Sequence, residues 1–538
     1  MPQICFTRES TDRKEMYFAE MQRRKDSLSS TALNEIGESC SSSSADFVSI
    51  YQSLPHYLMS CLDYCAIVHR GRYGSPLTKA YMARLLSAED LTPEKEGELI
   101  ENLANNVIDE LIHLGLLIET HTTVSYTFDY GPNIGFNESY VNLCVVEVDE
   151  VEFLAEAANL PVRAIIHHHR NNIPPDFKTL QIRSLFLNAS GPGFSRAYLE
   201  TICRLQYLLV LSLDGGLGEG LPDEVGDLFH LRYLRSKFFL KDELPQTLGN
   251  LQNLQTLDII AHRKLKELPL QVFNIQQLRH INIRTGYPST SSGIRVPSGI
   301  GTLKSLLTLG EVYAGGVIAS ELSSLTQLQQ LSVGCVSEDN STQLFAAITK
   351  MENLVSLSLK ADEFYSLNSS VLDLESFSPP SSIKHLRLYG ALVEMPAWLA
   401  SMENLTVLHL SFSNLLEPPA PTLQFLPKLK ALHIDSAYNV RCIGKEFCDL
   451  GGFPKLEILT FHGEDTLVEW TEIGRGAFLS LRNLEFWFCP NLRFLPEGLQ
   501  NISSLQVLIL CDTHIDLKRR LLGEESYKIK HISNVSIS

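Results

Sequence analysis

The residues best suited to binding chemistry stand between the leucines of short apolar phrases in the second half of the chain. The intervening positions carry arginine, histidine, glutamate, aspartate, tyrosine and tryptophan. Such side chains are metal ligands or the anchors of protein interfaces. They would share one surface only if the phrases are strands of one sheet, because side chains alternate between the two faces of a strand.

The apolar phrases have the form L-x-x-L-x-L, and residues 505–510 are the last copy. Their spacing of 22 to 29 residues is typical of leucine-rich repeats, which stack into a horseshoe with a parallel β-sheet on its concave face. We therefore predict an α/β solenoid of about 14 such repeats over residues 176–538. Its anchors, the penultimate apolar residue of each phrase, are Leu185, Leu211, Leu234, Leu257, Ile281, Leu309, Leu331, Leu357, Leu386, Leu408, Leu432, Leu459, Leu484 and Leu508.

Aligning these anchors predicts a protein-binding patch on the concave face. Aromatic and arginine side chains favour this interpretation because they bury much area with few rotatable bonds. The alternative is that exposed strand positions accept almost any residue. The first predicted row is Arg387, His409, His433, Thr460 and Glu485, and the second is Tyr389, Ser411, Asp435, His462 and Trp487.

Histidines raise two further possibilities. His409 and His433 could chelate a metal, but no third ligand accompanies them, so we predict no metal site. Protonation below about pH 6.5 would make their row more cationic. The triplet at residues 167–169 also suggests a metal, but consecutive side chains cannot all face one side of a strand, so we interpret it as a solvated turn.

Motifs of catalysis are missing from the sequence. It contains neither G-x-S-x-G nor H-E-x-x-H, and its acidic residues are not paired by motif. We therefore expect no enzyme and no cofactor.

The composition of the chain limits the classes of binding partner and the cellular compartment that we expect. The net charge of −17, from 62 acidic and 45 basic residues, argues against a general nucleic-acid-binding surface. No apolar run reaches the roughly 18 residues of a membrane span, and the first residues lack the apolar core of a signal peptide. The 11 cysteines are scattered, as expected for reduced thiols. These features predict a cytoplasmic protein, in which the N-x-[ST] triplets occur by chance.

The region before the repeats divides into three parts that differ in composition and in the spacing of apolar residues. Residues 1–45 are polar and serine-rich, and predict a flexible arm. Residues 46–128 show apolar residues at helical spacing and end in a β-rich stretch, which is the outline of a winged-helix-like domain. Residues 129–175 are expected to link this domain to the solenoid and to cap its open end.

Three segments of the helical region resemble a known family. Residues 54–65 (LPHYLMSCLDYC) look like the L-P-x-x-L-K-x-C-F-L-Y-C segment of plant nucleotide-binding leucine-rich-repeat disease-resistance proteins of the coiled-coil type. Residues 77–83 (LTKAYMA) and 109–117 (DELIHLGLL) are similar to that family's next two segments. The resemblance covers most of residues 50–538, and implies a winged helix followed by repeats that act in defence.

Other motifs of that family are absent. Its G-x-x-x-x-G-K-[ST] phosphate-binding loop does not occur, and only the aspartate of its M-H-D segment remains, at Asp129. Binding of ATP or ADP by the family's mechanism is therefore not expected. The chain resembles a truncated relative that retains the repeats.

Two classes of function follow. The first is a non-catalytic, immune-receptor-like protein that recognises a pathogen effector, a guarded host protein or another immune receptor. The second is an intracellular scaffold or ubiquitin-ligase substrate receptor unrelated to defence. An extracellular receptor is disfavoured by the missing signal and membrane segments. The sequence does not define the ligand or the oligomeric state.

Overall fold

The computed structural model describes residues 4–8 and, with internal gaps, residues 50–538. The gaps are residues 71–76, 94, 121–132, 136–145, 148–160, 169–180, 190–192, 218–219, 240–241, 262–264, 286–292, 363–369, 393 and 416–419. The chain divides into two compact units, each considered separately below. Unit 1 comprises residues 1–265 and 269–286, and unit 2 comprises residues 266–268 and 287–538.

The helical part of unit 1 consists of helices and three short strands. It contains α3 (His56–Arg70), β2 (Leu77–Thr78), α4 (Lys79–Ala88), α5 (Ile100–His113), β3 (Ile118–Thr120) and β4 (Asn133–Gly135). The three strands form a small antiparallel sheet in the order β2-β4-β3. Helix α4 begins after Thr78, whose hydroxyl accepts a hydrogen bond from the amide of Tyr81 and so caps the first turn. The predicted β-rich stretch at residues 122–128 lies outside the described residues.

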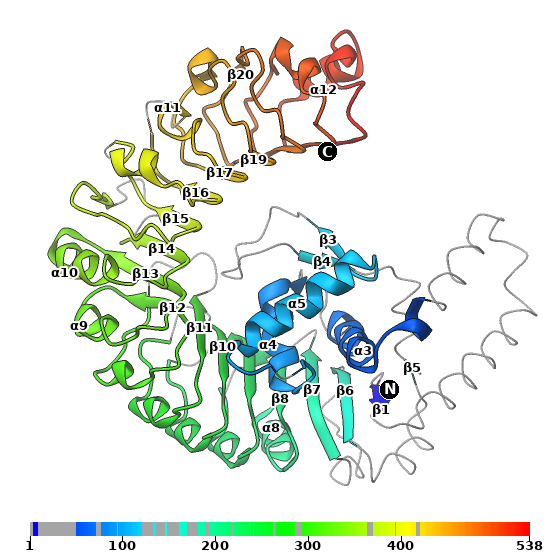
Figure 1. Ribbon diagram of the computed structural model, residues 1–538, viewed down its shortest axis with the longest axis vertical. Helices are drawn as coiled ribbons and strands as arrows, with labels where there is room; N and C mark the ends of the chain where they lie inside the picture. The colour runs from blue at the N-terminus through cyan, green and yellow to red at the C-terminus, as the bar shows by residue number, and fades with distance from the viewer. Residues whose placement is uncertain are drawn as a thin grey trace, which may run out of the picture. The chain divides into compact units, whose positions relative to one another are not determined.

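The repeats of unit 1 contribute six parallel strands in sequence order (Figure 1). Leu185, Leu211, Leu234, Leu257 and Ile281 pair in register, as the period predicts. Buried leucines therefore follow one another across the sheet. The strands are β6 (Pro161–His168), β7 (Gln181–Ala189), β8 (Val210–Leu217), β9 (Tyr233–Phe239), β10 (Thr256–Ala261) and β11 (His280–Thr285).

The start of this sheet differs from the sequence expectation. Strand β6 lies before residue 176 and includes His167 and His168, which correspond to the predicted solvated turn. Strand β1 (Ile4–Arg8), within the predicted flexible arm, runs antiparallel to both β5 (Val146–Glu147) and β6. These segments form strands because they pair with strands that are distant in sequence. Such pairing cannot be predicted from local composition.

Unit 2 continues the same pattern with parallel strands that pair in chain order (Figure 1). Leu309 and the later anchors lie opposite one another through Leu508, and the predicted final strand pairs with the last repeat. The strands are β12 (Thr308–Tyr313), β13 (Gln330–Val336), β14 (Ser356–Ala361), β15 (His385–Tyr389), β16 (Val407–Ser411), β17 (Ala431–Asp435), β19 (Ile458–His462), β21 (Asn483–Trp487), β22 (Val507–Cys511) and β23 (Asn534–Ile537), with β18 (Cys442–Ile443) and β20 (Glu469–Trp470) paired separately.

Short helices return the chain from one strand to the next. Several begin directly after a Leu-Pro or Met-Pro pair, because proline lacks the amide hydrogen that a strand ladder requires and its φ suits the start of a helix. The 3-10 helices are η2 (Asp223–Asp227), η3 (Gln246–Asn250), η4 (Leu270–Asn274), η5 (Ile300–Thr302), η6 (Ala397–Ser401), η7 (Lys445–Phe447), η8 (Glu497–Asn501) and η9 (Ser526–Lys528), and the α-helices are α8 (Arg196–Ile202), α9 (Ile318–Leu322), α10 (Glu338–Ile348), α11 (Ala420–Leu423) and α12 (Ile515–Leu522).

Aromatic packing fills the unit 2 core between β17 and β21. The Trp470 ring is fully buried and lies edge-on to Phe447, Phe461 and Phe478, with ring centroids 5.8, 6.1 and 6.1 Å away. Its Nε1 donates to the carbonyl oxygen of Glu472 at 2.9 Å. The bulky ring thus supports several consecutive repeats at once.

Trp470→Ala should destabilise unit 2 by about 3–5 kcal/mol, because it removes an aromatic core side chain and leaves a cavity. Urea unfolding monitored by circular dichroism measures the loss. Phe425→Ala is the matched control, since Phe425 is 66% exposed and should change stability by at most about 0.5 kcal/mol. Equal effects of the two substitutions would contradict this account of the core.

Candidate functional site

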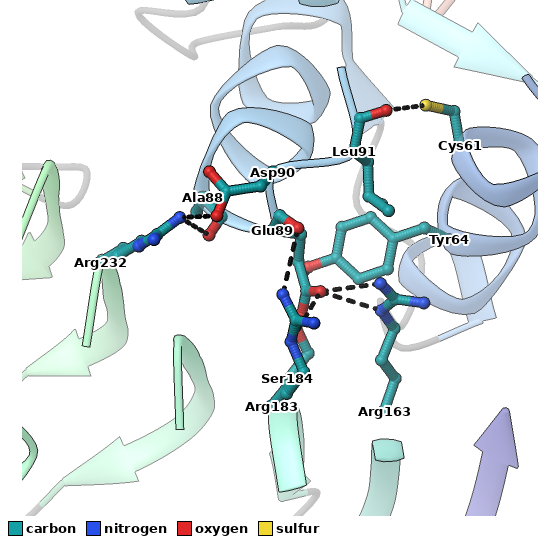
Figure 2. Close-up of polar contacts among 10 residues, drawn as sticks. All are labelled: Cys61, Tyr64, Ala88, Glu89, Asp90, Leu91, Arg163, Arg183, Ser184 and Arg232. Carbon is teal, nitrogen blue, oxygen red and sulfur yellow. Dashed lines mark hydrogen bonds and ion pairs between the residues drawn. The ribbon is translucent and has the colours of Figure 1, made fainter. Parts of the chain in front are cut away.

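The repeat sheet of unit 1 carries the helical segment on its surface. Figure 2 shows the contact at the end of α4, where Glu89 is buried against Arg163 of β6, with Oε2 2.8 Å from the guanidinium Nη2. The hydroxyl of Ser184 donates to the other carboxylate oxygen, and the Tyr64 hydroxyl lies 3.0 Å from Ser184. The Arg163 guanidinium also lies over the Tyr64 ring, 5.0 Å from its centroid. Helices α3 and α4 and strands β6 and β7 therefore meet around one buried carboxylate.

Two further charge pairs continue this contact along the helices. Asp90 pairs with Arg232, which also donates to the carbonyl oxygen of Ala88 at 3.3 Å. At the start of α5, Glu101 accepts two hydrogen bonds of 2.5 Å from Arg279. Burial alone would raise the pKa of Glu101, but its hydrogen bonds with His280 and Arg279 lower it to about 2. Acidic residues at the helix ends thus face arginines that lie on the strands or directly before them.

A second buried carboxylate lies within the sheet surface. Asp258 pairs with Arg235 and, at 3.2 Å, with Arg284. The Arg235 guanidinium lies 5.0 Å from the centroid of the Tyr81 ring, which α4 contributes. Sequence reasoning missed this surface, because charges in distant segments cannot be paired without the fold. In unit 1, these strand positions hold the helices and are not free for a partner.

Unit 2 brings the predicted site residues together in the two expected rows. Arg387, His409, His433, Thr460 and Glu485 pair in register on β15, β16, β17, β19 and β21. Tyr389, Ser411, Asp435, His462 and Trp487 do the same two positions later. The alignment of the leucine anchors was therefore sufficient to place all ten residues.

Hydrogen bonds fix the orientation of the second row. Asp435 Oδ1 lies 2.9 Å from Nδ1 of His462, and Ser411 Oγ lies 2.9 Å from Nε2 of His409. Nε1 of Trp487 donates to Oε2 of Glu485 at 2.9 Å, which couples the two rows. Side chains held in this way lose little conformational entropy when a partner binds.

Ring contacts extend the arrangement across the strands. The ring of Tyr389 lies 5.6 Å from that of His409, which in turn lies 5.6 Å from His433. The Lys360 ammonium is 5.0 Å from the Tyr389 centroid and pairs with Glu311. A continuous chain of contacts thus runs from β12 to β17.

The two rows differ in exposure. Arg387, Thr460 and Glu485 of the first row are buried, as are Ser411 and Asp435 of the second. The side chain of His462 is 24% exposed, and Tyr389 and Trp487 are also partly exposed. The accessible part of the predicted patch is therefore its aromatic and imidazole members, while the buried polar residues orient them.

The expected protonation of the row near pH 6.5 is wrong. Burial lowers the pKa of His433 to about 4, with the nearby Arg387 contributing in the same direction. The pKa of His409 is also lowered, by burial and then by Arg387 and His433. Both imidazoles are therefore neutral near pH 7.

The cluster does not have the arrangement of a catalytic triad. Ser411 contacts His409, but the best-placed hydrogen bond of Asp435 is to a different imidazole, that of His462. Ser411 is fully buried, so its hydroxyl has no access to a substrate. Within the described part of the chain, no group of three or more histidine, cysteine or acidic side chains is placed to hold a metal ion.

One accessible aromatic residue was missed from the sequence. Phe488 directly follows β21, is 49% exposed and has a φ of 52°. Left-handed backbone costs an L-residue about 1–2 kcal/mol. The corresponding position after β19 is Gly463 and that after β22 is Asp512, both with positive φ. Phe412 after β16 and Ser436 after β17 also have positive φ, so this backbone conformation is a feature of the repeat. Glycine at this place in some repeats, Gly390 and Gly463, was the sequence signal for it.

Comparisons with known proteins identify the repeats. A family model described as a leucine-rich repeat region matches residues 181–524. An Arabidopsis thaliana protein named for disease resistance, At1g58400, is 26% identical over 508 residues, which cover 90% of this chain and 54% of that protein. The A. thaliana disease resistance protein RPP8 is 26% identical over 469 residues, covering 82% of this chain and 49% of its own length. This chain thus spans about half the length of these relatives.

Solved structures of repeat proteins are also similar. A leucine-rich-repeat protein of Leptospira interrogans is 19% identical with a TM-score of 0.35, covering 68% of this chain and 93% of that one. The plant peptide hormone receptor RGFR1 is 22% identical with a TM-score of 0.37, covering 64% of this chain and 57% of that one. Among the residues that the structure describes, no helix has the length and apolar character required to cross a bilayer.

Glu89→Gln should loosen the helices on the sheet of unit 1. It leaves the buried Arg163 guanidinium without a counter-charge, which typically costs about 3–5 kcal/mol. Hydrogen exchange of the α4 and α5 amides should accelerate accordingly. Asp109→Asn is the control, because Asp109 pairs with Lys79 at the surface with a side chain 60% exposed, and such pairs contribute at most about 1 kcal/mol. Similar exchange in both variants would refute the buried contact.

The site histidines should make the protein less stable in acid. The pKa of His433 is about 4 in the folded chain and about 6.5 when unfolded, so between these values the unfolded chain binds more protons. The contribution of neutral His433 to the free energy of unfolding is complete above about pH 6.5 and is lost as the pH falls toward 4. Melting temperatures from pH 7 to pH 4.5 test this, and His433→Asn should reduce the decline. An NMR titration of His433 with a midpoint near 6.5 would contradict it.

Proposed function

Because the chain belongs to the leucine-rich-repeat family, we propose that it is a non-catalytic recognition protein of plant defence that binds another protein through the accessible residues on the sheet of unit 2. The partner is a pathogen effector, a guarded host protein or another immune receptor. Its disease-resistance relatives in A. thaliana support a role in defence. We propose the cytoplasm as its site of action.

One observation carries the proposal: the sheet of unit 1 is occupied, and that of unit 2 presents aromatic side chains. Tyr389, His462 and Trp487 are partly exposed and share one row. Aromatic residues held by buried polar neighbours have the properties of interface hot spots, which combine large area with few rotatable bonds. Each is oriented by a contact within the unit, so the surface is prepared before binding.

The alternative of a ubiquitin-ligase substrate receptor receives less support. That function would use the helical region to bind a ligase adaptor. Helices α4 and α5 instead bury Glu89 and Glu101 against the arginines of the unit 1 sheet. This use of the helix ends favours a structural role for them within the chain.

Replacing Tyr389, His462 and Trp487 together by alanine should abolish the contribution of this protein to resistance. The measurement is pathogen growth in leaves of plants that lack the endogenous protein and express either form at equal level. A matched variant replaces the exposed Phe425, Leu450 and Leu479, which lie outside these rows, by alanine. It should retain resistance. Full resistance in the first variant, with its melting temperature unchanged, would rule out the proposed surface.

A further inference from the structure

We propose that the edge of the unit 2 sheet at which its middle strands begin binds the surface of a membrane that contains anionic phospholipids. This edge, which we call the basic rim, consists of the six residues directly before each of β15, β16, β17, β19 and β21. It is separate from the row of Tyr389 and Trp487, which are the last residues of their strands. The basic residues of the rim are Lys384, Lys428, Lys430, Lys455 and Arg482.

The basic rim has the opposite charge from the chain as a whole. It contains five basic side chains and two acidic ones, Glu403 and Glu457, in a chain whose net charge is −17. Glu457 pairs with Lys430 at 2.9 Å, which leaves four cations against Glu403. The six residues that follow each of these strands in the sequence contain four acidic and two basic side chains in total. Because parallel strands all begin at one edge of a sheet, the positive charge is collected at that edge.

Backbone hydrogen bonds align the residues of the basic rim. The carbonyl oxygen of Lys384 accepts from the amide of Thr406 at 2.8 Å, and that of Thr406 accepts from the amide of Lys430 at 2.8 Å. The carbonyl oxygen of Lys430 accepts from Glu457 at 2.7 Å, and that of Glu457 from Arg482 at 2.9 Å. Four strand steps of about 4.8 Å separate β15 from β21, so the rim extends over about 19 Å.

The cations of the basic rim are accessible. Lys384, Lys428, Lys455 and Arg482 are exposed. Within the part of the chain that the structure describes, these four side chains form no ion pair. Lys428 donates to the neutral side-chain oxygen of Asn404 at 2.7 Å, which orients the lysine without removing its charge. Four positive charges are therefore available to an anionic ligand.

Exposed apolar side chains accompany these cations. Phe425 is 66% exposed and precedes Lys428 by three residues, and Leu479 is 68% exposed and precedes Arg482 by three residues. Basic and large apolar side chains on one surface are also the combination that holds amphipathic helices at membranes. The apolar groups enter the boundary of the acyl chains, and the basic groups remain among the anionic headgroups.

The predominance of lysine in the basic rim favours a membrane over an acidic protein. Four of its five basic residues are lysines. Lysine is depleted at protein interfaces, where arginine is enriched and its guanidinium binds a carboxylate through two hydrogen bonds. A lysine ammonium is instead a compact charge on a flexible stem, which can lie along apolar groups while the charge stays in water. Such side chains suit a fluid anionic surface that offers no fixed geometry.

Cosedimentation of the full chain with lipid vesicles tests this membrane site. Vesicles of phosphatidylcholine with about 30% phosphatidylserine should bind the protein, and vesicles of phosphatidylcholine alone should not. Binding should weaken steeply between about 0.1 M and about 1 M NaCl, because the Debye length falls from about 10 Å to about 3 Å. Absence of binding, or binding that is equal for the two kinds of vesicle, overturns the proposal.

Charge variants locate the site. Replacing Lys428, Lys455 and Arg482 together by glutamine should weaken binding to the anionic vesicles about hundredfold, since each basic residue near such a surface contributes about fivefold. The melting temperature should not change, because all three side chains are exposed. The matched control removes the same charge from exposed positions outside the basic rim and should bind as the unaltered chain does. It carries Arg441→Gln, Lys445→Gln and Arg493→Gln. Equal losses in the two variants would mean that only net charge matters, and would refute the site.

Apolar variants separate a membrane from a soluble polyanion. Phe425→Ser together with Leu479→Ser should weaken vesicle binding about tenfold, because less apolar surface enters the bilayer. Leu450→Ser together with Leu522→Ser is the control, since these side chains are 75% and 74% exposed but lie outside the basic rim. If polyglutamate or RNA binds the chain as tightly as the vesicles do, the ligand is an acidic protein or a nucleic acid and the membrane proposal is wrong. Resistance in plants is a separate readout, so this proposal and the proposed role in defence can fail independently.

Discussion

Parallel pairing in register is the constraint on which the other features of both units depend. Each strand places its leucines opposite those of the next, and Leu408 between Leu386 and Leu432 is one instance among many. A shift by one residue would move every leucine to the opposite face, so burial fixes the register strongly. The same pairing fixes the outward residues. Burial of the leucines therefore also aligns the outward residues into the rows that contain His409 and Trp487. No further interaction is needed to bring these residues together.

Buried charged side chains have different roles in the two sheets: in unit 1 they hold helices on the strands, and in unit 2 they orient neighbouring rings. A carboxylate such as Glu89 is costly to bury, and Arg163 and Ser184 offset that cost only in one geometry. The pair therefore selects how α4 sits on the strands of unit 1. In unit 2, buried polar groups such as Asp435 and Glu485 orient neighbouring rings instead. The same repeated strand pattern thus forms both a surface that binds helices of the same chain and the surface that we propose binds a partner.

Much of the fold could be predicted because the same short sequence pattern recurs in each repeat. The period located the strands, and the anchors placed Arg387 to Trp487 in the correct rows. Exposure and protonation could not be predicted, because they depend on the packing of neighbours: Glu485 is buried and the pKa of His433 is lowered by burial. The positions of β1 and β6 and the pairing of Glu89 with Arg163 also escaped, since each joins segments far apart in sequence.

Because helices cover the sheet of unit 1, amino-acid substitutions on that sheet are more constrained than those on the sheet of unit 2. A substitution at Arg163 or Arg279 must remain compatible with the strand ladder and with a carboxylate on a helix, so two sets of contacts constrain each position. Phe488, which directly follows β21 in unit 2, is 49% exposed, so fewer neighbouring residues constrain its side chain. The tolerance for new side chains is therefore uneven along one repeated motif. Variation that alters recognition without unfolding the chain has most room where the surface is not already used for the protein's own assembly.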